Sequence, residues 1–302
     1  MRDLTAVINV RNGQPFIEET LSSLFRQDYP VSVLVIDNQS TDDTAAVVAK
    51  FPLAQYVRTL QPLGLGAARS FSLSYVKTKY VAWLDSDDLW EPAFSASMRR
   101  AMEKASDAVL LTTGTICIDS EGKELPALEP YQRKYRIHPR RENKDRLEKG
   151  DTLEALLMTM RPRWAWCATV FKTDVVKDVG GFDPSLVYCE DLDIIAKVLR
   201  KGTSVHVPAN LTKYRRHPNQ DTRKLNPETI YHEKLLVLKR VGQDAGLLSR
   251  RRISEMERIT EIKCLLTHFF RNRDLGKGLW AFAKCLDPRI FAYLIRRASF
   301  AI

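Results

Sequence analysis

Apolar and polar residues alternate in blocks along the first hundred residues, and these blocks predict strands that alternate with helices. Unbroken apolar or β-branched runs are typical of parallel strands that are buried on both faces. Apolar residues at helical spacing between the runs predict helices. The predicted strands are 4–10, 31–36 and 80–84, and the predicted helices are 15–27, 67–76 and one that ends at Lys50. Because strands joined through helices run parallel, the pattern predicts an α/β fold with a mostly parallel central sheet flanked by helices.

The pattern is more mixed after residue 100, where strands and helices no longer alternate regularly. Residues 129–150 are charged and contain proline, which favours a loop over the sheet. From Thr229 onward the spacing indicates helices, with apolar residues recurring beside arginines. Further predicted strands are 107–118 and 168–171, and further predicted helices are 152–160 and 190–200. We therefore expect an α/β domain over 1–220 and a basic helical region over 221–302.

Polar residues follow three of the predicted strands directly, namely Asn12, Asp37 and Asp85. In open parallel sheets, ligands bind beyond the carboxyl ends of the strands, so these side chains are expected at one edge. Asp85 opens a cluster of three carboxylates with Asp87 and Asp88. Close like charges repel, and a divalent cation with oxygen ligands relieves the repulsion. The alternative is an acidic turn in which Asp87 or Asp88 caps the helix after Pro92.

Composition places the chain among ordinary globular proteins. Its 302 residues are 44% hydrophobic and 28% charged, and no stretch of 18 residues is apolar enough to span a bilayer. No signal peptide precedes the first predicted strand. The five cysteines form no CxxC pair, which favours free thiols in a reducing cytoplasm over a zinc site or disulfides.

The net charge of +10 is concentrated in the last third of the chain. Residues 201–302 carry 21 Lys and Arg against 9 Asp and Glu, a net charge of +12. This excess suggests an anionic partner, and an equally simple interpretation is a solvated helical surface. The amphipathic basic segment 276–302 suggests contact with an anionic membrane, with a helical lid or a dimer interface as the alternatives.

An ordered set of motifs resembles the family 2 glycosyltransferases, inverting enzymes of the GT-A fold, over residues 4–220. Each motif is weak alone, and their order and spacing together are specific. The motifs are 7–13, 35–42, 64–69, 84–90, 180–183, 190–193 and 214–217. Asn9 and Arg11 stand where the family often has Pro and Tyr, and Asn38 and Gln39 where it often has Asp and Gly.

The resemblance implies a Rossmann-like GT-A domain with a helical C-terminal extension. It implies transfer of a sugar from a nucleoside-diphosphate sugar, UDP- or dTDP-linked, to a hydroxyl of a saccharide or lipid-linked acceptor. It also implies a Mn²⁺ or Mg²⁺ cofactor and a role in cell-surface polysaccharide or glycoconjugate synthesis. We expect a cytoplasmic protein, peripheral on the inner face of the membrane if 276–302 binds lipid, and no nucleic-acid partner.

The resemblance also assigns residues to the donor and the metal. Asp87 would bind the metal, Asp85 the ribose or the metal, and His217 a phosphate or the metal, against the alternative of a structural histidine. Asp88 would support this cluster as a helix cap or as a partner behind it. The residues expected to bind the nucleotide sugar are Val10, Arg11, Asn12, Asp37, Asn38, Arg69, Asp85 and Ser86.

The base and the acceptor site are assigned in the same way. Asp191 resembles the general base, and its neighbour Glu190 is the second candidate. Acidic residues in the first turn of a helix are also favoured by the helix dipole alone. Trp164 and Trp166 could stack on an acceptor sugar or pack in the core, and Arg215 could contact the acceptor or a phosphate.

Two other classes of function remain as alternatives. A nucleotidyltransferase also uses an α/β sheet and paired carboxylates, but it would need a glycine-rich basic loop near the N-terminus, and residues 9–16 hold one glycine. A basic nucleic-acid-binding protein would fit the +12 tail and not the acidic strand ends.

Overall fold

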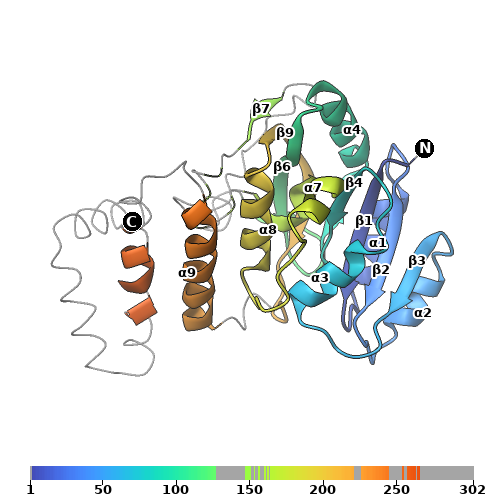
Figure 1. Ribbon diagram of the computed structural model, residues 1–302. Coiled ribbons are helices and arrows are strands. Elements are labelled where there is room, and N and C mark those ends of the chain that lie inside the picture. Colours follow the sequence, from blue (N-terminus) through green and yellow to red (C-terminus); the bar gives the residue numbers. More distant parts are fainter. Residues whose placement is uncertain are drawn as a thin grey trace. The chain divides into compact units, whose positions relative to one another are not determined.

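The computed structural model (Figure 1) divides the chain into two compact units, Met1–Gln220 and Asp221–Ile302. The residues that the structure describes are 2–126, 147–150, 153, 156, 160, 162, 164–220, 226–244, 254, 257–262, 264 and 265.

A mixed sheet runs through the first unit. Its described strands pair in the order β3-β2-β1-β4-β8-β6-β9-β5, with β7 added on β9. The strands are β1 (Leu4–Val10), β2 (Ser32–Asp37), β3 (Ala54–Arg58), β4 (Tyr80–Trp83), β5 (Leu89–Trp90), β6 (Ala108–Ile118), β7 (Glu148–Lys149), β8 (Thr169–Lys172) and β9 (Thr203–Arg215). The predicted α/β class is therefore confirmed, and the strands predicted in the first hundred residues are all present.

Strands β3, β2, β1 and β4 form the parallel part of this sheet, as the alternating pattern predicts. Six of the seven residues of β1 are buried, because helices cover both faces. Residues 5–10 of β1 pair in register with residues 32–37 of β2, and residues 4–7 pair with 80–83 of β4. The carboxyl ends of these three strands consequently meet at one edge, called here the carboxyl edge.

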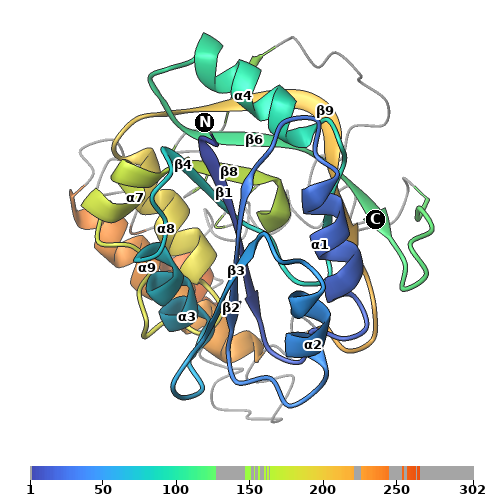
Figure 2. The ribbon, with the colours of Figure 1, turned by 90° about the vertical axis from the view of Figure 1, so that its right-hand side faces the viewer.

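Helices lie on both faces of the sheet. Figure 2 shows α1 and α2 on one face and α3, α7 and α8 on the other. Helix α1 turns Ile17, Leu21 and Leu24 into the core and keeps Glu18 and Glu19 outside, as its amphipathic pattern predicts. The described helices are α1 (Ile17–Phe25), α2 (Thr44–Ala49), α3 (Leu65–Leu73), α4 (Phe94–Lys104), α7 (Thr173–Asp178), α8 (Glu190–Leu199) and a short 3₁₀ turn at Trp166–Ala168.

The second half of the sheet differs from the mostly parallel arrangement that the sequence predicts. Strand β8 runs antiparallel to both of its neighbours, β4 and β6. Strand β9, the longest, follows α8 and was not predicted from the sequence. Pro208 lies within it, and its pairing with β6 is irregular around Gly114, so it lacks the clean alternation of a regular strand.

Other predictions fall partly or wholly outside the described residues. These are most of the loop 129–150, most of the helix 152–160 and the whole segment 276–302. In the second unit the structure describes α9 (Pro227–Asp244), which agrees with the helices predicted after Thr229.

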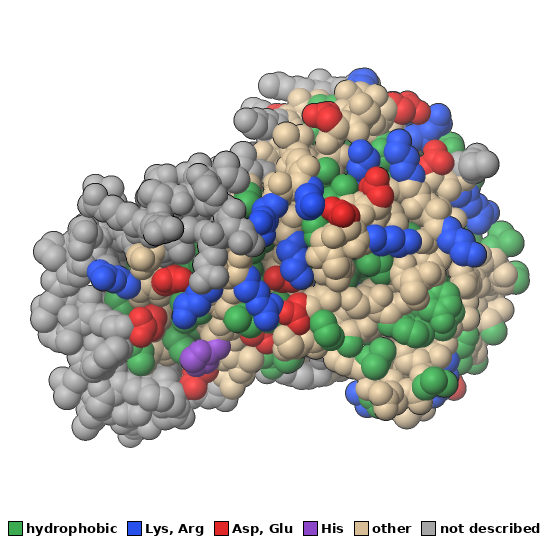
Figure 3. All heavy atoms as spheres, in the orientation of Figure 1, with side chains coloured by type: hydrophobic (Ala, Val, Ile, Leu, Met, Phe, Trp, Pro, Cys, Tyr) green, Lys and Arg blue, Asp and Glu red, His purple; other side chains and the backbone are tan. Residues whose placement is uncertain are grey.

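Charged side chains of both signs are interspersed over the described part of the face in Figure 3, with apolar side chains between them. None of the described helices is long and apolar enough to cross a membrane.

Candidate active site

The carboxyl edge gathers the polar residues that follow β1, β2 and β4. Asn12, Asp37 and Asp85 come just after or at the ends of three strands that are neighbours and parallel. Their common edge follows directly from the predicted strand alternation.

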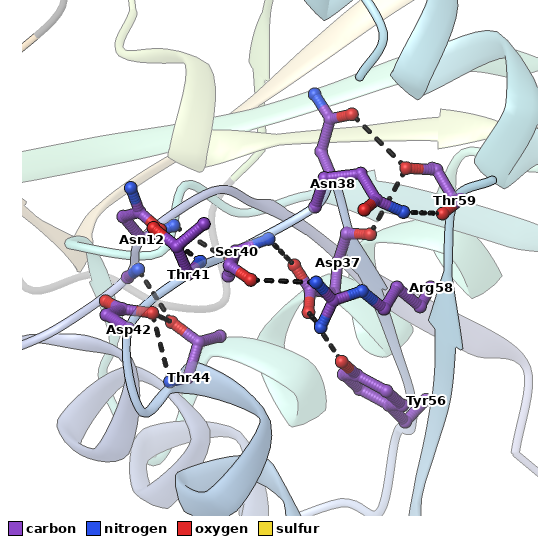
Figure 4. Close-up of polar contacts among 12 residues, drawn as sticks. Asn12, Asp37, Asn38, Ser40, Thr41, Asp42, Thr44, Tyr56, Arg58 and Thr59 are labelled. Carbon is purple, nitrogen blue, oxygen red and sulfur yellow. Dashed lines mark hydrogen bonds and ion pairs between the residues drawn. The ribbon is translucent and has the colours of Figure 1, made fainter. Parts of the chain in front are cut away.

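The loops after β1 and β2 are tied together by side-chain hydrogen bonds (Figure 4). The Asn12 backbone N–H donates to Ser40 Oγ at 2.9 Å, and Asn12 Oδ1 accepts from the Thr41 backbone N–H at 2.8 Å. Asn12 has a positive φ of 55°, a conformation that asparagine tolerates better than most residues. This part of the edge is therefore ordered by its own contacts.

Asp37 is fully buried beneath this loop. Its Oδ1 accepts from the Ser40 backbone N–H at 2.8 Å, while Oδ2 accepts from the Tyr56 hydroxyl and lies 3.5 Å from the Arg58 guanidinium. Burial, followed by the contact with Asp37, raises the pKa of Tyr56. A carboxylate that contacts a nucleoside needs an exposed oxygen, whereas this one braces the loop between β2 and β3.

Replacing Asp37 by asparagine should lower the free energy of unfolding by about 2 kcal/mol, because buried partners lose a charged acceptor. Urea denaturation measures this change. The control is Glu18→Gln, which removes an exposed ion pair with Lys50 and should cost about 0.5 kcal/mol or less. Full stability of Asp37→Asn combined with weaker nucleotide binding would instead assign Asp37 to the donor.

Asn38 follows Asp37, and its side-chain amide both donates and accepts a hydrogen bond. Its Nδ2 donates to the Leu63 carbonyl and its Oδ1 accepts from the Leu63 N–H, each at 2.8 Å. An aspartate at this position could not donate to that carbonyl. Val10 is buried and its carbonyl accepts from the Asn38 N–H at 2.7 Å, whereas Arg11 is exposed.

Arg69 of α3 joins the acidic cluster to α8. Its guanidinium contacts Asp85 Oδ1 at 3.2 Å and Glu190 Oε1 at 2.6 Å, and its Cζ lies 4.4 Å from the centre of the Trp166 ring. The Arg69 side chain is 5% exposed. The sequence suggested that Arg69 approaches the donor, but it gave no sign of the pairing with Glu190, which lies 121 positions away.

Close approach at the start of α3 helps to place this arginine. A Cβ on Gly66 would lie 2.5 Å from the Asp183 carbonyl oxygen, so only glycine fits against that backbone. Gly64 has open space around it and needs no such role.

Asp85 lies at the edge with a half-buried side chain. Burial and the carboxylates of Asp87 and Asp191 raise its pKa to about 6, and Arg69 acts in the opposite direction. Its side chain is 43% exposed, so solvent moderates the shift. Asp191, at the start of α8, contributes to this shift, so its carboxylate lies close enough to act on Asp85 at the end of β4.

Asp87 faces His217 across the same edge. Asp87 Oδ2 lies 2.9 Å from His217 Nε2, and the His217 ring lies against Phe16, with 4.7 Å between ring centres. Ser86, between the two acidic residues, is half-buried, and its carbonyl accepts from the Thr20 hydroxyl at 2.9 Å.

Asp88 is buried behind this pair and does not cap a helix. Its Oδ1 accepts from the Arg215 backbone N–H at 2.9 Å, while α4 begins after Ala93 with no side-chain cap. The capping alternative is therefore wrong, because the carboxylate turns inward to β9. Burial, followed by Asp87 and Asp85, raises the pKa of Asp88 well above its usual range.

Asp191 lies in the first turn of α8 and is half-buried, next to Glu190, which is 3% exposed. Asp191 Oδ1 accepts from the Leu192 backbone N–H at 2.6 Å. Burial and the carboxylates of Asp191 and Asp85 raise the pKa of Glu190 to about 8, against the effect of Arg69. The two predicted base candidates thus differ clearly in exposure.

Trp166 belongs to an aromatic cluster, with its ring centre 6.2 Å from Trp83 and 6.1 Å from Phe182. Trp164 is 6% exposed. The contacts of Trp166 and the burial of Trp164 fit the packing interpretation, and Trp166 also forms the surface on which Arg69 lies. Arg215, the third acceptor candidate, is 1% exposed, which leaves it no surface for an acceptor.

Comparison with known proteins adds independent information. The family model described as "Glycosyl transferase family 2" matches residues 5–161, more than half of the chain. This chain belongs to glycosyl transferase family 2.

The curated relatives that this family 2 chain matches are distant, and each is covered only in part. It is 24% identical over 221 residues to an uncharacterized glycosyltransferase of Rickettsia typhi, covering 72% of this chain and 65% of the relative. It is 30% identical over 93 residues to the UDP-Glc:alpha-D-GlcNAc-diphosphoundecaprenol beta-1,3-glucosyltransferase WfaP of Escherichia coli, covering 30% of this chain and 37% of that one. The chain thus spans less than two-thirds of the length of these relatives.

Solved structures show that the fold is GT-A. TarS 1–349 of S. aureus in complex with UDP-GlcNAc gives a TM-score of 0.66 at 19% identity, covering 89% of this chain and 73% of that one. The mannosyltransferase PcManGT of Pyrobaculum calidifontis, in complex with GDP-Man and Mn²⁺, gives 0.59 at 16% identity, covering 100% and 81%.

The side chains that could serve as metal ligands in this family 2 chain fit a site that is completed by substrate. No group of three or more His, Cys, Asp or Glu side chains that could hold a metal occurs among the described residues. The facing Asp87 carboxylate and His217 imidazole, with Asp85 nearby, supply an incomplete set of oxygen and nitrogen ligands. Mn²⁺ and Mg²⁺ commonly bind through one or two carboxylates and take further ligands from substrate phosphates.

The raised pKa of Glu190 predicts that the stability of the family 2 domain depends on pH. A folded-state pKa of about 8 against an ordinary 4.5 means that the folded state holds a proton which the unfolded state has released. Between these pH values the free energy of unfolding should fall as pH rises, by up to ~1.4 kcal/mol per pH unit. Below 4.5 this contribution is constant.

Glu190→Gln should remove this part of the pH dependence, since glutamine carries no proton to release. Denaturation at pH 5, 6.5 and 8 should give a variant that gains on the wild type as pH rises. Parallel curves for the two proteins would show that Glu190 is not protonated in the folded state at neutral pH.

Proposed function

We propose that this chain is an inverting, metal-dependent glycosyltransferase. It moves a sugar from a UDP- or dTDP-linked donor to a hydroxyl of a saccharide or lipid-linked acceptor, in cell-surface polysaccharide or glycoconjugate synthesis. The main support for this proposal is that Arg69 contacts one residue of each of two acidic pairs from different parts of the chain. Asp85 and Asp87 come from the end of β4, and Glu190 and Asp191 come from the start of α8.

Each group has a chemical task in an inverting displacement. Asp87 and His217, with Asp85, would hold the divalent metal, which stabilises the negative charge on the departing diphosphate. Asp191 takes the proton of the acceptor hydroxyl as the hydroxyl oxygen bonds to the anomeric carbon. The bond from that carbon to the diphosphate breaks on the opposite side, so the configuration is inverted.

Known relatives support the donor and acceptor classes. TarS is named in complex with UDP-GlcNAc, and WfaP is named for a diphosphoundecaprenol acceptor.

A panel of nucleotide sugars tests the proposal. The wild-type protein is incubated with UDP-, dTDP- and GDP-linked sugars in Mn²⁺, with simple saccharides and a polyprenyl-diphosphate sugar as acceptors. We expect release of nucleoside diphosphate from one donor class, lost in EDTA and restored by Mn²⁺. No turnover and no binding of any donor would refute the proposal, and release of pyrophosphate would favour nucleotidyl transfer.

A further inference from the structure

Arg215, the last residue of β9, is buried at the centre of a hydrogen-bond network behind the acidic cluster. Its Nε donates to the Asp87 carbonyl at 2.9 Å, and its Nη1 donates to the carbonyls of Asp119 and Ser120 at 3.2 and 3.1 Å. Its Nη2 donates to the carboxylate of Glu19 on α1. One guanidinium therefore joins three separate parts of the chain.

The backbone of Arg215 also contacts the acidic loop, which is the segment 85–88. The Arg215 N–H donates to Asp88 Oδ1, so Asp87 is held through its carbonyl and Asp88 through its side chain. Fixing the Asp87 carbonyl restricts the backbone from which its carboxylate projects. Arg215 therefore limits the positions that this carboxylate can reach, and the contact with His217 fixes its direction.

His217 is placed by the same residue. The Arg215 Cζ lies 4.8 Å from the centre of the Phe16 ring, and the His217 ring packs on Phe16 as well. Gln220 connects the two residues further, since its Nε2 donates to the Arg215 carbonyl and its Oε1 accepts from the His217 N–H at 3.4 Å. Arg215 thus controls both members of the Asp87–His217 pair.

We propose that Arg215 is a positioning residue that holds Asp87 and His217 at the separation needed to bind a divalent cation with a nucleoside diphosphate. The inference rests on the proposed function of the acidic loop. It assigns Arg215 no contact with donor or acceptor, because the side chain is 1% exposed. A lysine cannot replace it, since one ammonium cannot reproduce the planar fork that reaches three groups.

The test measures binding of Mn²⁺ together with UDP by calorimetry in Arg215→Lys, beside steady-state turnover. We expect at least a tenfold weaker Mn²⁺–UDP affinity and a similar rise in donor KM, with acceptor KM changed less than threefold. The matched control is Lys213→Gln, which removes a charge from the same strand and breaks a partly exposed ion pair with Glu91. It should behave as the wild type.

A folded Arg215→Lys with unchanged Mn²⁺–UDP affinity would overturn the inference and leave the proposed function intact. Wild-type protein that binds no Mn²⁺–UDP would overturn both. Should circular dichroism show that Arg215→Lys is unfolded, Glu19→Gln takes its place, because it removes the charged partner that orients the Arg215 guanidinium and lies on α1, away from the Asp87–His217 contact. We then expect at least a threefold loss of Mn²⁺–UDP affinity, and no loss would contradict the inference.

Discussion

Asp87→Ala should abolish metal binding and lower kcat/KM for the donor by about 10²- to 10³-fold. The reason is that charge stabilisation at a departing diphosphate contributes several kcal/mol, and each 1.36 kcal/mol corresponds to about a tenfold change in rate. Asp87 supplies the only carboxylate that faces His217 in the described structure. The measurement is nucleoside diphosphate release against Mn²⁺ concentration, with Mn²⁺ binding followed separately by calorimetry.

The control for this change is Asp178→Ala, which removes a carboxylate whose side chain is 64% exposed and pairs with Lys201. It should leave both quantities unchanged. Retention of more than a tenth of wild-type turnover by Asp87→Ala, at any Mn²⁺ concentration, would remove Asp87 from the proposed metal site.

Asp191→Asn should lower kcat by about 10²- to 10⁴-fold and leave donor KM nearly unchanged, as expected for loss of a general base. Glu190→Gln is the informative comparison. Burial raises the pKa of Glu190 to about 8, so at pH 7 this residue is mostly protonated and cannot accept a proton. Its Oε1 still accepts from Arg69, which gives it a part in orienting α8.

Steady-state kinetics at saturating donor separates the two carboxylates. If Asp191 is the base, its asparagine variant loses more of kcat than Glu190→Gln and still binds Mn²⁺–UDP like the wild type. The reverse order of the two losses would transfer the role of base to Glu190.

The carboxyl edge could be predicted from the sequence because the alternation of strands and helices is a local pattern. Runs of apolar residues identified β1, β2 and β4, and topology then required Asn12, Asp37 and Asp85 to share an edge. The side-chain directions at that edge were beyond such reasoning. Asp37 turns inward to Tyr56, and no spacing along the chain distinguishes this from an exposed carboxylate.

Contacts between segments that are distant along the chain could not be predicted, because spacing in the sequence does not identify such partners. The Arg69–Glu190 pair and the contact of Arg215 with the acidic loop join residues more than a hundred positions apart. Both arginines were predicted to touch ligands, since an isolated arginine in a sequence gives no sign of its burial. Glu190 lies on α8, and Arg215 reaches the acidic loop from the end of β9, the strand that was not predicted from the sequence.

The hydrogen bond between Arg69 and Glu190 also constrains protein engineering. The family model covers residues 5–161, so α8 comes from the part of the chain beyond it. A chimaera that keeps residues 1–161 and takes its later segment from another family member would bury the Arg69 guanidinium beside a new helix. Such a hybrid needs an acceptor at position 190, because the buried guanidinium would otherwise keep its contact with Asp85 and lose its partner on the helix, which is costly.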